Sequence, residues 1–133
     1  MAKLVAKHTD RGAPLYLDDD VELFISVPSK VQDGLLTVDT TKVYQFAINA
    51  NGAQSDNFGN KTDWKAAAQK GERDWTVEVF IPYAAIGVTG PPSPGLPWGM
   101  QFGRQQKAKG ETTSWTKGQS FIQKDGFGEI VFE

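Results

Sequence analysis

Apolar and polar residues alternate along several short stretches of this sequence, which is typical of strands whose two faces differ. The clearest stretch is 75–81 (WTVEVFI), and Pro82 ends it because proline cannot donate a hydrogen bond to a neighbouring strand. Further strands are expected at 43–49, 98–105 and 129–132. Strands at roughly 10-residue spacing with turns between them predict an all-β, antiparallel β-sandwich of the jelly-roll or immunoglobulin-like two-sheet type.

Other segments carry weaker signals. Residues 4–7 and 35–38 are each expected to form a short strand, and 53–63 is polar and rich in Gly and Asn, which predicts a loop. Residues 64–69 contain three consecutive alanines that also permit a short helix, but we expect a strand. Proline at the start and glycine at the end of 82–87 predict one helical turn.

Composition limits the kinds of protein that this chain can be. Its 133 residues suggest a single domain over 1–133, and a net charge of -2 gives no reason to expect nucleic acid or a membrane as a partner. There is no cysteine, which excludes disulfides and thiolate metal sites. His8 is the one histidine, which excludes histidine-rich zinc sites and weakens any Ser-His-Asp hypothesis.

An acidic stretch leads into one of the expected strands. In 16–27 (YLDDDVELFISV), three aspartates are followed by a strand with aliphatic residues on one face and Glu22, Phe24 and Ser26 on the other. This strand carries a glutamate on its outer face and follows an acidic turn, which itself follows the aromatic Tyr16. Such an arrangement is typical of the wall of a polar site. The alternative is an ordinary turn before a half-buried strand, because aspartates are common in turns.

Several phrases in a fixed order indicate a family. They are DDVELF at 19–24, YQF at 44–46, WTVEVFIP at 75–82, WGMQFGR at 98–104, and the segment from Phe121 into the last strand. Together they resemble family 9 carbohydrate-binding modules, the domains appended to bacterial xylanases and other secreted polysaccharide-degrading enzymes. The resemblance covers about residues 15–133.

The resemblance implies an antiparallel β-sandwich that binds sugars between two aromatic side chains. By position, these platforms fall on Tyr16 and Phe121, where the sugar-binding members carry tryptophan. Glu22 matches a carboxylate that binds sugar hydroxyls, and Gln45 and Asn49 lie on the strand that supplies further polar contacts.

Two departures from the family pattern bear on affinity and assembly. Ala47 stands where an arginine is expected, and with the substituted platforms this predicts weak binding, roughly μM to mM. The family also has additional strands ahead of the acidic turn, of which only 4–7 remains. An open sheet edge is therefore expected, and a homodimer could cover it.

The function implied is non-catalytic binding of a plant polysaccharide or its oligosaccharides, targeting an associated glycoside hydrolase domain. The resemblance also implies an extracellular or periplasmic location in a bacterium. Two alternatives stay open. The first is a glycoside hydrolase that uses the acidic cluster at Asp18–Glu22, with Glu78 facing the same groove. The second is an interaction domain that has kept the fold and lost the sugar.

The sequence also bears on cofactors and on one arginine. No cofactor is expected, apart from a structural Ca²⁺ that Asp18, Asp19 and Asp20 could ligate with loop carbonyls. Haem is rejected because Met100, which with His8 would have to ligate it, alternates as a core residue. Arg104 falls on the same face of its strand as Trp98, Met100 and Phe102, which is apolar. We therefore expect it to be buried and paired with Glu22, Glu78 or one of the aspartates.

Overall fold

The computed structural model describes residues 3–30, 36–38, 42–117 and 126–133, and within these ranges the chain is all-β, with no α-helix. Short 3₁₀ turns occur at η1 (Leu15–Leu17), η3 (Tyr83–Ile86) and η4 (Lys107–Lys109). The strands are β1 (Asp20–Ser26), β2 (Pro28–Lys30), β3 (Leu36–Val38), β4 (Tyr44–Asn49), β5 (Gln54–Asp56), β6 (Lys65–Lys70), β7 (Trp75–Phe80), β8 (Pro97–Gln106), β9 (Glu111–Ser114) and β10 (Gly128–Val131).

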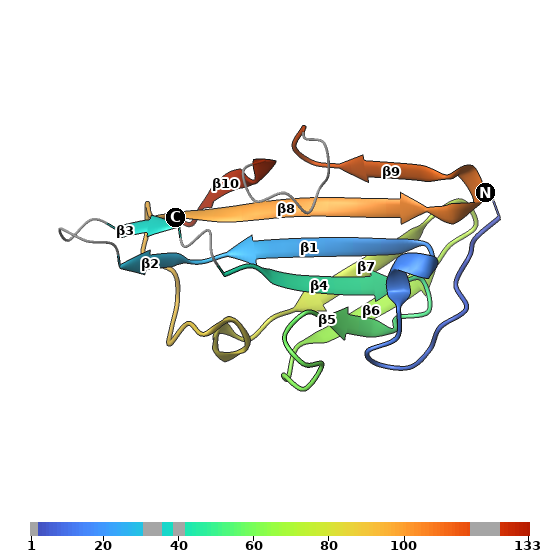
Figure 1. Cartoon of the computed structure of the whole chain (residues 1–133), viewed down its shortest axis with the longest axis horizontal. Coiled ribbons are helices and arrows are strands. Elements are labelled where there is room, and N and C mark those ends of the chain that lie inside the picture. The colour runs from blue at the N-terminus through green and yellow to red at the C-terminus, as the bar shows by residue number, and fades with distance from the viewer. Residues whose placement is uncertain (1–2, 31–35, 39–41, 118–125) are drawn as a thin grey trace.

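Six strands form the main antiparallel sheet, in the order β10-β8-β1-β4-β5, with β9 also paired to β8 (Figure 1). The long strand β8 has room for both neighbours on one edge, because Met100 lies opposite Gly128 of β10 and Arg104 lies opposite Thr113 of β9. Two further pairs, β2 with β3 and β6 with β7, form separate two-stranded sheets.

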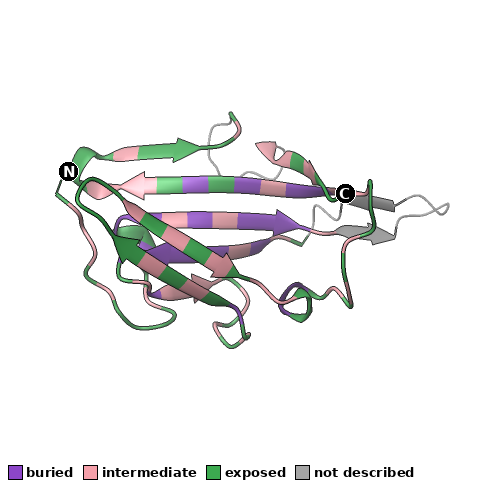
Figure 2. Ribbon diagram, turned by 180° about the vertical axis from the view of Figure 1, so that it is seen from behind, coloured by how far each residue is buried: buried purple, intermediate pink, exposed green. Residues whose placement is uncertain are grey.

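The β6–β7 hairpin crosses one face of the main sheet and is in front of it in Figure 2. Its inward residues Ala66, Val77 and Val79 pack on the hydrophobic core, as the alternation in 75–81 predicts. The hairpin does not reach the β8–β9 side of the sheet, where Phe102 and Trp115 remain exposed. The buried members of the core are Ile25, Tyr44, Phe46, Ile48, Trp64, Ile86 and Trp98.

The opposite face of the main sheet is polar, yet it is also largely covered. Glu22 is only 4% exposed, and the ring of Phe24 packs on Phe127 with centroids 5.9 Å apart. The segment before β1 covers another part, where Leu15 contacts Ala47 and Ala53. The buried polar residues on this side are Asp18, Asp20, Glu22, Ser26, Asn49 and Gln101. A covered polar face is unusual in a small all-β protein and directs attention to that side.

The expected strands at 43–49, 64–69, 75–81, 98–105 and 129–132 are confirmed within a residue or two. The strand expected at 4–7 is wrong, because no described residue before Asp20 is in a strand. There, the Asp19 N–H donates to the carbonyl of Val5 at 2.6 Å, and the Val5 N–H donates to Asp19 Oδ2 at 3.1 Å. The Asp19 side chain therefore accepts the backbone hydrogen bond that a neighbouring strand would have accepted from Val5.

Two strands lie where the sequence shows no strand signal. The expected loop at 53–63 includes β5, and β9 follows η4 after the end of β8. Neither strand shows alternation of apolar residues, so pairing with the edge of a formed sheet determines them. No helix among the described residues is long and apolar enough to cross a membrane.

Candidate binding site on the polar face

A hollow of about 390 Å³ opens on the polar face, between the segment before β1 and strands β4 and β5. Tyr16, Glu22 and Gln45, three of the five residues expected to bind sugar, line it together. They come from positions far apart in the sequence, and the antiparallel pairing of β1 with β4 brings the last two together. The hollow is within the size range of small-molecule sites.

Tyr16 is held at the mouth of the hollow by its neighbours. The η1 turn buries Leu15 against Ala47 and Ala53, and the Asp18 N–H closes the turn by donating to the carbonyl of Leu15 at 2.9 Å. Tyr16, on the other side of the turn, is 58% exposed. Its ring is therefore available to a ligand and does not contribute to the core.

Ala47 is one of the residues that line the hollow. It lies directly opposite Glu22 on one side and Ser55 on the other, so all three side chains point to the same face. A methyl group at this position leaves space that a long side chain would fill. The resemblance predicts an arginine at this position, and the alanine found there lines the hollow.

Glu22 and Gln45 supply the polar groups of the hollow. The Gln45 amide donates to Glu22 Oε2 at 3.2 Å, which fixes the orientation of both side chains. Burial raises the pKa of Glu22, although hydrogen bonds from Asp20, Gln45 and Gln105 and the charge of Lys107 oppose this effect.

Asp20 is the neighbour of Glu22 on the same face of β1. Burial, with the nearby charge of Glu22, raises the pKa of Asp20 to about 8. Neither oxygen of Asp20 has a hydrogen-bond partner among the described residues when both carboxyls are ionised. A proton held between Asp20 and Glu22 supplies the missing donor, so the pair carries one negative charge at neutral pH.

The rim of the hollow is a compact loop organised by Asp56, whose side chain is fully buried. Asp56 Oδ1 accepts hydrogen bonds from the backbone N–H groups of Phe58 and Asn60 at 3.0 and 2.8 Å. Its Oδ2 accepts a hydrogen bond from the indole of Trp64 at 2.9 Å. Asn60 has a φ of 56°, a left-handed conformation that asparagine tolerates.

Sequence reasoning assigned this loop no role. Asp56 and Asn60 line the hollow, but 53–63 was predicted only to be a loop. The available signal was the spacing of an aspartate, a glycine and an asparagine within five residues, which is typical of a side chain that caps its own turn.

Asn49 does not line the hollow. Its amide donates to Asp18 Oδ2 at 2.9 Å and to the carbonyl of His8 at 2.8 Å. Its Oδ1 accepts from the N–H groups of Asn51 and Ala53. The side chain is fully buried and ties the N-terminal segment to the end of β4.

The three aspartates expected to ligate Ca²⁺ have three different environments. Asp18 accepts from the His8 N–H and imidazole and from Asn49, and Asp20 pairs with Glu22. Asp19 accepts from the Val5 and Lys107 N–H groups. Within the described ranges, no group of three or more His, Cys, Asp or Glu residues could hold a metal ion.

The pKa of Asp18 shows what these contacts do. Burial by itself would raise it, but the hydrogen bonds from the backbone of His8 and Lys7, from Asn49 and from the imidazole outweigh burial and lower the pKa. Asp18 is therefore an ionised anchor for the N-terminal segment.

Three further residues are placed as follows. Phe121 lies outside the described residues. Glu78 is on the exposed side of the hairpin, whereas Glu22 is on the polar face of the main sheet, so the two do not share the groove that the hydrolase alternative would need. Arg104 is not buried, because the hairpin does not cover its end of β8. It is about half exposed and pairs with Glu111 at 2.6 Å, not with a residue of the acidic stretch.

Comparison with protein-family models, with curated proteins and with solved structures gives no match for this chain.

Proposed function

We propose that the protein binds saccharides weakly and without catalysis, in the hollow on its polar face. The observation that carries the proposal is that an exposed tyrosine, Tyr16, stands at the mouth of a hollow whose wall presents the hydrogen-bonded pair of Glu22 and Gln45. A sugar ring has apolar C–H faces and a belt of hydroxyl groups. An aromatic face beside a carboxylate and an amide matches both.

The expected affinity follows from these few contacts. Covering one aromatic ring contributes about 1 kcal/mol, from roughly 50 Å² at about 25 cal/mol per Å². Each net hydrogen bond adds about 1 kcal/mol, and one to a charged group somewhat more. After the cost of association, dissociation constants of roughly μM to mM remain. Such an affinity suits a module that holds a catalytic partner on a polymer through many weak encounters.

The finer classification belongs to the same proposal. The main sheet and the β6–β7 hairpin on its core face would form an antiparallel β-sandwich like that of the family 9 carbohydrate-binding modules. The module would be attached to a glycoside hydrolase outside the bacterial cytoplasm. The edges formed by β5 and β9 are where a homodimer would form.

The hydrolase alternative has less support. Glycoside hydrolysis needs two carboxyl groups on either side of the bond that is cleaved, roughly 5–9.5 Å apart. Asp20 and Glu22 are neighbours on one face of β1 and are nearly fully buried, and Glu78 is on another surface. An acid and a base acting across a substrate are therefore not available from the residues that were considered for this role.

Isothermal titration calorimetry with glucose, cellobiose and xylo-oligosaccharides tests the proposal. We expect weak binding to at least one of them, and at least a fivefold loss of affinity in Glu22→Gln. Glu78→Gln is the matched control, because Glu78 is exposed on another surface, and it should bind as the unaltered protein does. No heat of binding with any of these sugars would overturn the proposal. Release of reducing sugar from xylan, abolished in Glu22→Gln, would favour the hydrolase.

A further inference from the structure

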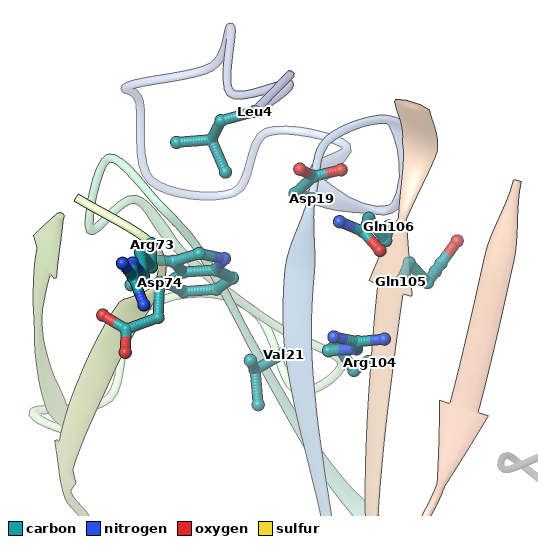
Figure 3. A pocket seen from close by; sticks show the side chains of 9 residues that line it. Leu4, Asp19, Val21, Arg73, Asp74, Arg104, Gln105 and Gln106 are labelled. Carbon is teal, nitrogen blue, oxygen red and sulfur yellow. The ribbon is translucent and has the colours of Figure 1, made fainter. Parts of the chain in front are cut away.

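A second groove lies on the other side of the main sheet, where the turn between β6 and β7 approaches the end of β8 (Figure 3). Its volume is about 180 Å³. Val21 lies between its walls, with Arg73 on the hairpin side and Arg104 on β8. Glu22 and Gln45 point to the opposite face of the sheet, so the groove is separate from the hollow described above.

Hydrogen-bond donors in this groove lack partners within the protein. Among the described residues, neither the guanidinium of Arg73 nor the side-chain amide of Gln106 makes a hydrogen bond or an ion pair, although both line the groove. Arg104 uses Nη2 to contact Glu111 and has further N–H groups to donate. Two guanidinium groups and one amide are thus available to a ligand.

Two carboxylates, Asp19 and Asp74, also line the groove, but their oxygens are directed elsewhere. Both oxygens of Asp19 accept backbone hydrogen bonds, from Val5 at 3.1 Å and from Lys107 at 2.6 Å. Asp74 points away from Val21 and Arg104 in Figure 3. Its Oδ1 lies 2.8 Å from the position that a Cβ on Gly71 would take, so it is folded back over its own turn. The groove therefore offers more free donors than free acceptors.

We infer that this groove binds a uronic acid unit of an acidic saccharide. A sugar carboxylate accepts two parallel hydrogen bonds from a guanidinium, which is stronger than contact with a neutral group. Trp75 also lines the groove, and its indole offers apolar surface to the C–H groups of the ring. The small volume suits one sugar unit of a longer chain. This site goes beyond the proposed one, since it uses another face, other residues and another charge.

Titration with trigalacturonate, observed by two-dimensional NMR and by calorimetry, tests the inference. We expect binding that weakens with added salt, because the contacts are ionic and partly exposed. The shifted amide signals should include those of residues 71–75 and 104–107. Arg73→Gln together with Arg104→Gln should weaken binding at least tenfold. Both side chains are exposed, so the fold should survive both changes.

Two comparisons make the outcome decisive. Lys61→Gln with Lys65→Gln removes two positive charges from exposed positions elsewhere and should leave binding unchanged. Equal loss in this control, no binding of trigalacturonate, or equal binding of triglutamate would each overturn the inference. Glu22→Gln should not affect trigalacturonate, and if it does, the ligand is in the hollow and the inference fails. If the protein binds trigalacturonate but none of the neutral sugars, the proposed function of the hollow fails and the inference about the groove stands.

Discussion

Asp20 and Glu22, two residues apart on β1, direct their carboxyl groups to the same face of the main sheet. Both side chains are nearly inaccessible to water, and burial raises the pKa of each. Since two neighbouring buried carboxylates repel each other, Asp20 keeps a proton that the unfolded chain would release at neutral pH.

The first prediction concerns pH. The pKa of Asp20 is about 8 in the folded protein, against an ordinary value of 3.8. The folded state therefore binds more protons than the unfolded state between these values, and the free energy of unfolding falls as pH rises from about 4 to about 8. In Asp20→Asn, an amide donates to Glu22 at every pH. We expect urea unfolding of this variant to show a flatter pH dependence and a gain of about 1–3 kcal/mol at pH 8.

Asp10→Asn serves as the control, because Asp10 is exposed in the N-terminal segment. Its free energy of unfolding should follow that of the unaltered protein at each pH. The hypothesis that Asp20 keeps a proton is wrong if the free energy of unfolding of Asp20→Asn depends on pH as strongly as that of the unaltered protein. It is also wrong if the variant is the less stable of the two at pH 8.

The second prediction concerns Asn49. The change Asn49→Ala removes both donors and the acceptor of a buried amide, and leaves Asp18 and the N–H groups of Asn51 and Ala53 short of partners. We expect a loss of about 2–4 kcal/mol in the free energy of unfolding, since unsatisfied buried groups cost about 1–3 kcal/mol each. Gln69→Ala, on the exposed side of β6, should change stability by less than about 0.5 kcal/mol. Equal stability of the two variants would contradict this assignment.

The third prediction separates ligand contact from folding at Tyr16. Tyr16→Ala should weaken sugar binding about fivefold, corresponding to the roughly 1 kcal/mol of one aromatic contact. It should leave the midpoint of unfolding almost unchanged, because the ring is exposed and Leu15 anchors the turn. Tyr83→Ala, at another exposed tyrosine, should alter neither quantity. A large loss of stability in Tyr16→Ala would mean that the ring supports the fold.

The fourth prediction concerns the rim of the hollow. Trp64→Phe keeps an aromatic ring in the core but removes the indole N–H that donates to Asp56. The buried carboxylate then lacks one donor, and we expect a loss of about 1–3 kcal/mol. Faster hydrogen exchange at the N–H groups of Phe58 and Asn60 should accompany the change, because Asp56 holds both. Trp115→Phe, at an exposed tryptophan, is the control.

Sequence patterns predicted the strands that carry apolar side chains. Tyr44, Phe46 and Ile48 repeat with period two and are buried together, as this spacing requires. The pattern contains no comparable information for β5 and β9, whose residues are polar and whose pairing is decided by the neighbouring strand. Local sequence also could not show that Val5 would bond to the Asp19 side chain, which lies 14 residues further on.

The site was predictable to a different extent. Tyr16, Glu22 and Gln45 were placed on one surface by the strand phase and the resemblance together, and they do line one hollow. The alternation of residues along a strand could not predict the roles of Asn49 and Arg104. Parity gives the face of a residue, but it does not show whether that face is covered by another segment or left open.

Strand β8 pairs with β1 along one edge and with β9 and β10 along the other. During synthesis, the ribosome must therefore release most of the chain before β1 can bond to its second neighbour. The donor to Asp19 Oδ1, the N–H of Lys107, also lies 88 residues further along the chain. Until then, the nascent protein exposes the bare edge of β1 and leaves Asp19 Oδ1 without its donor. Contacts so distant in sequence slow folding, and bare edges invite association with other chains. The order in which the strands emerge makes the last third of this polypeptide the part on which correct assembly depends.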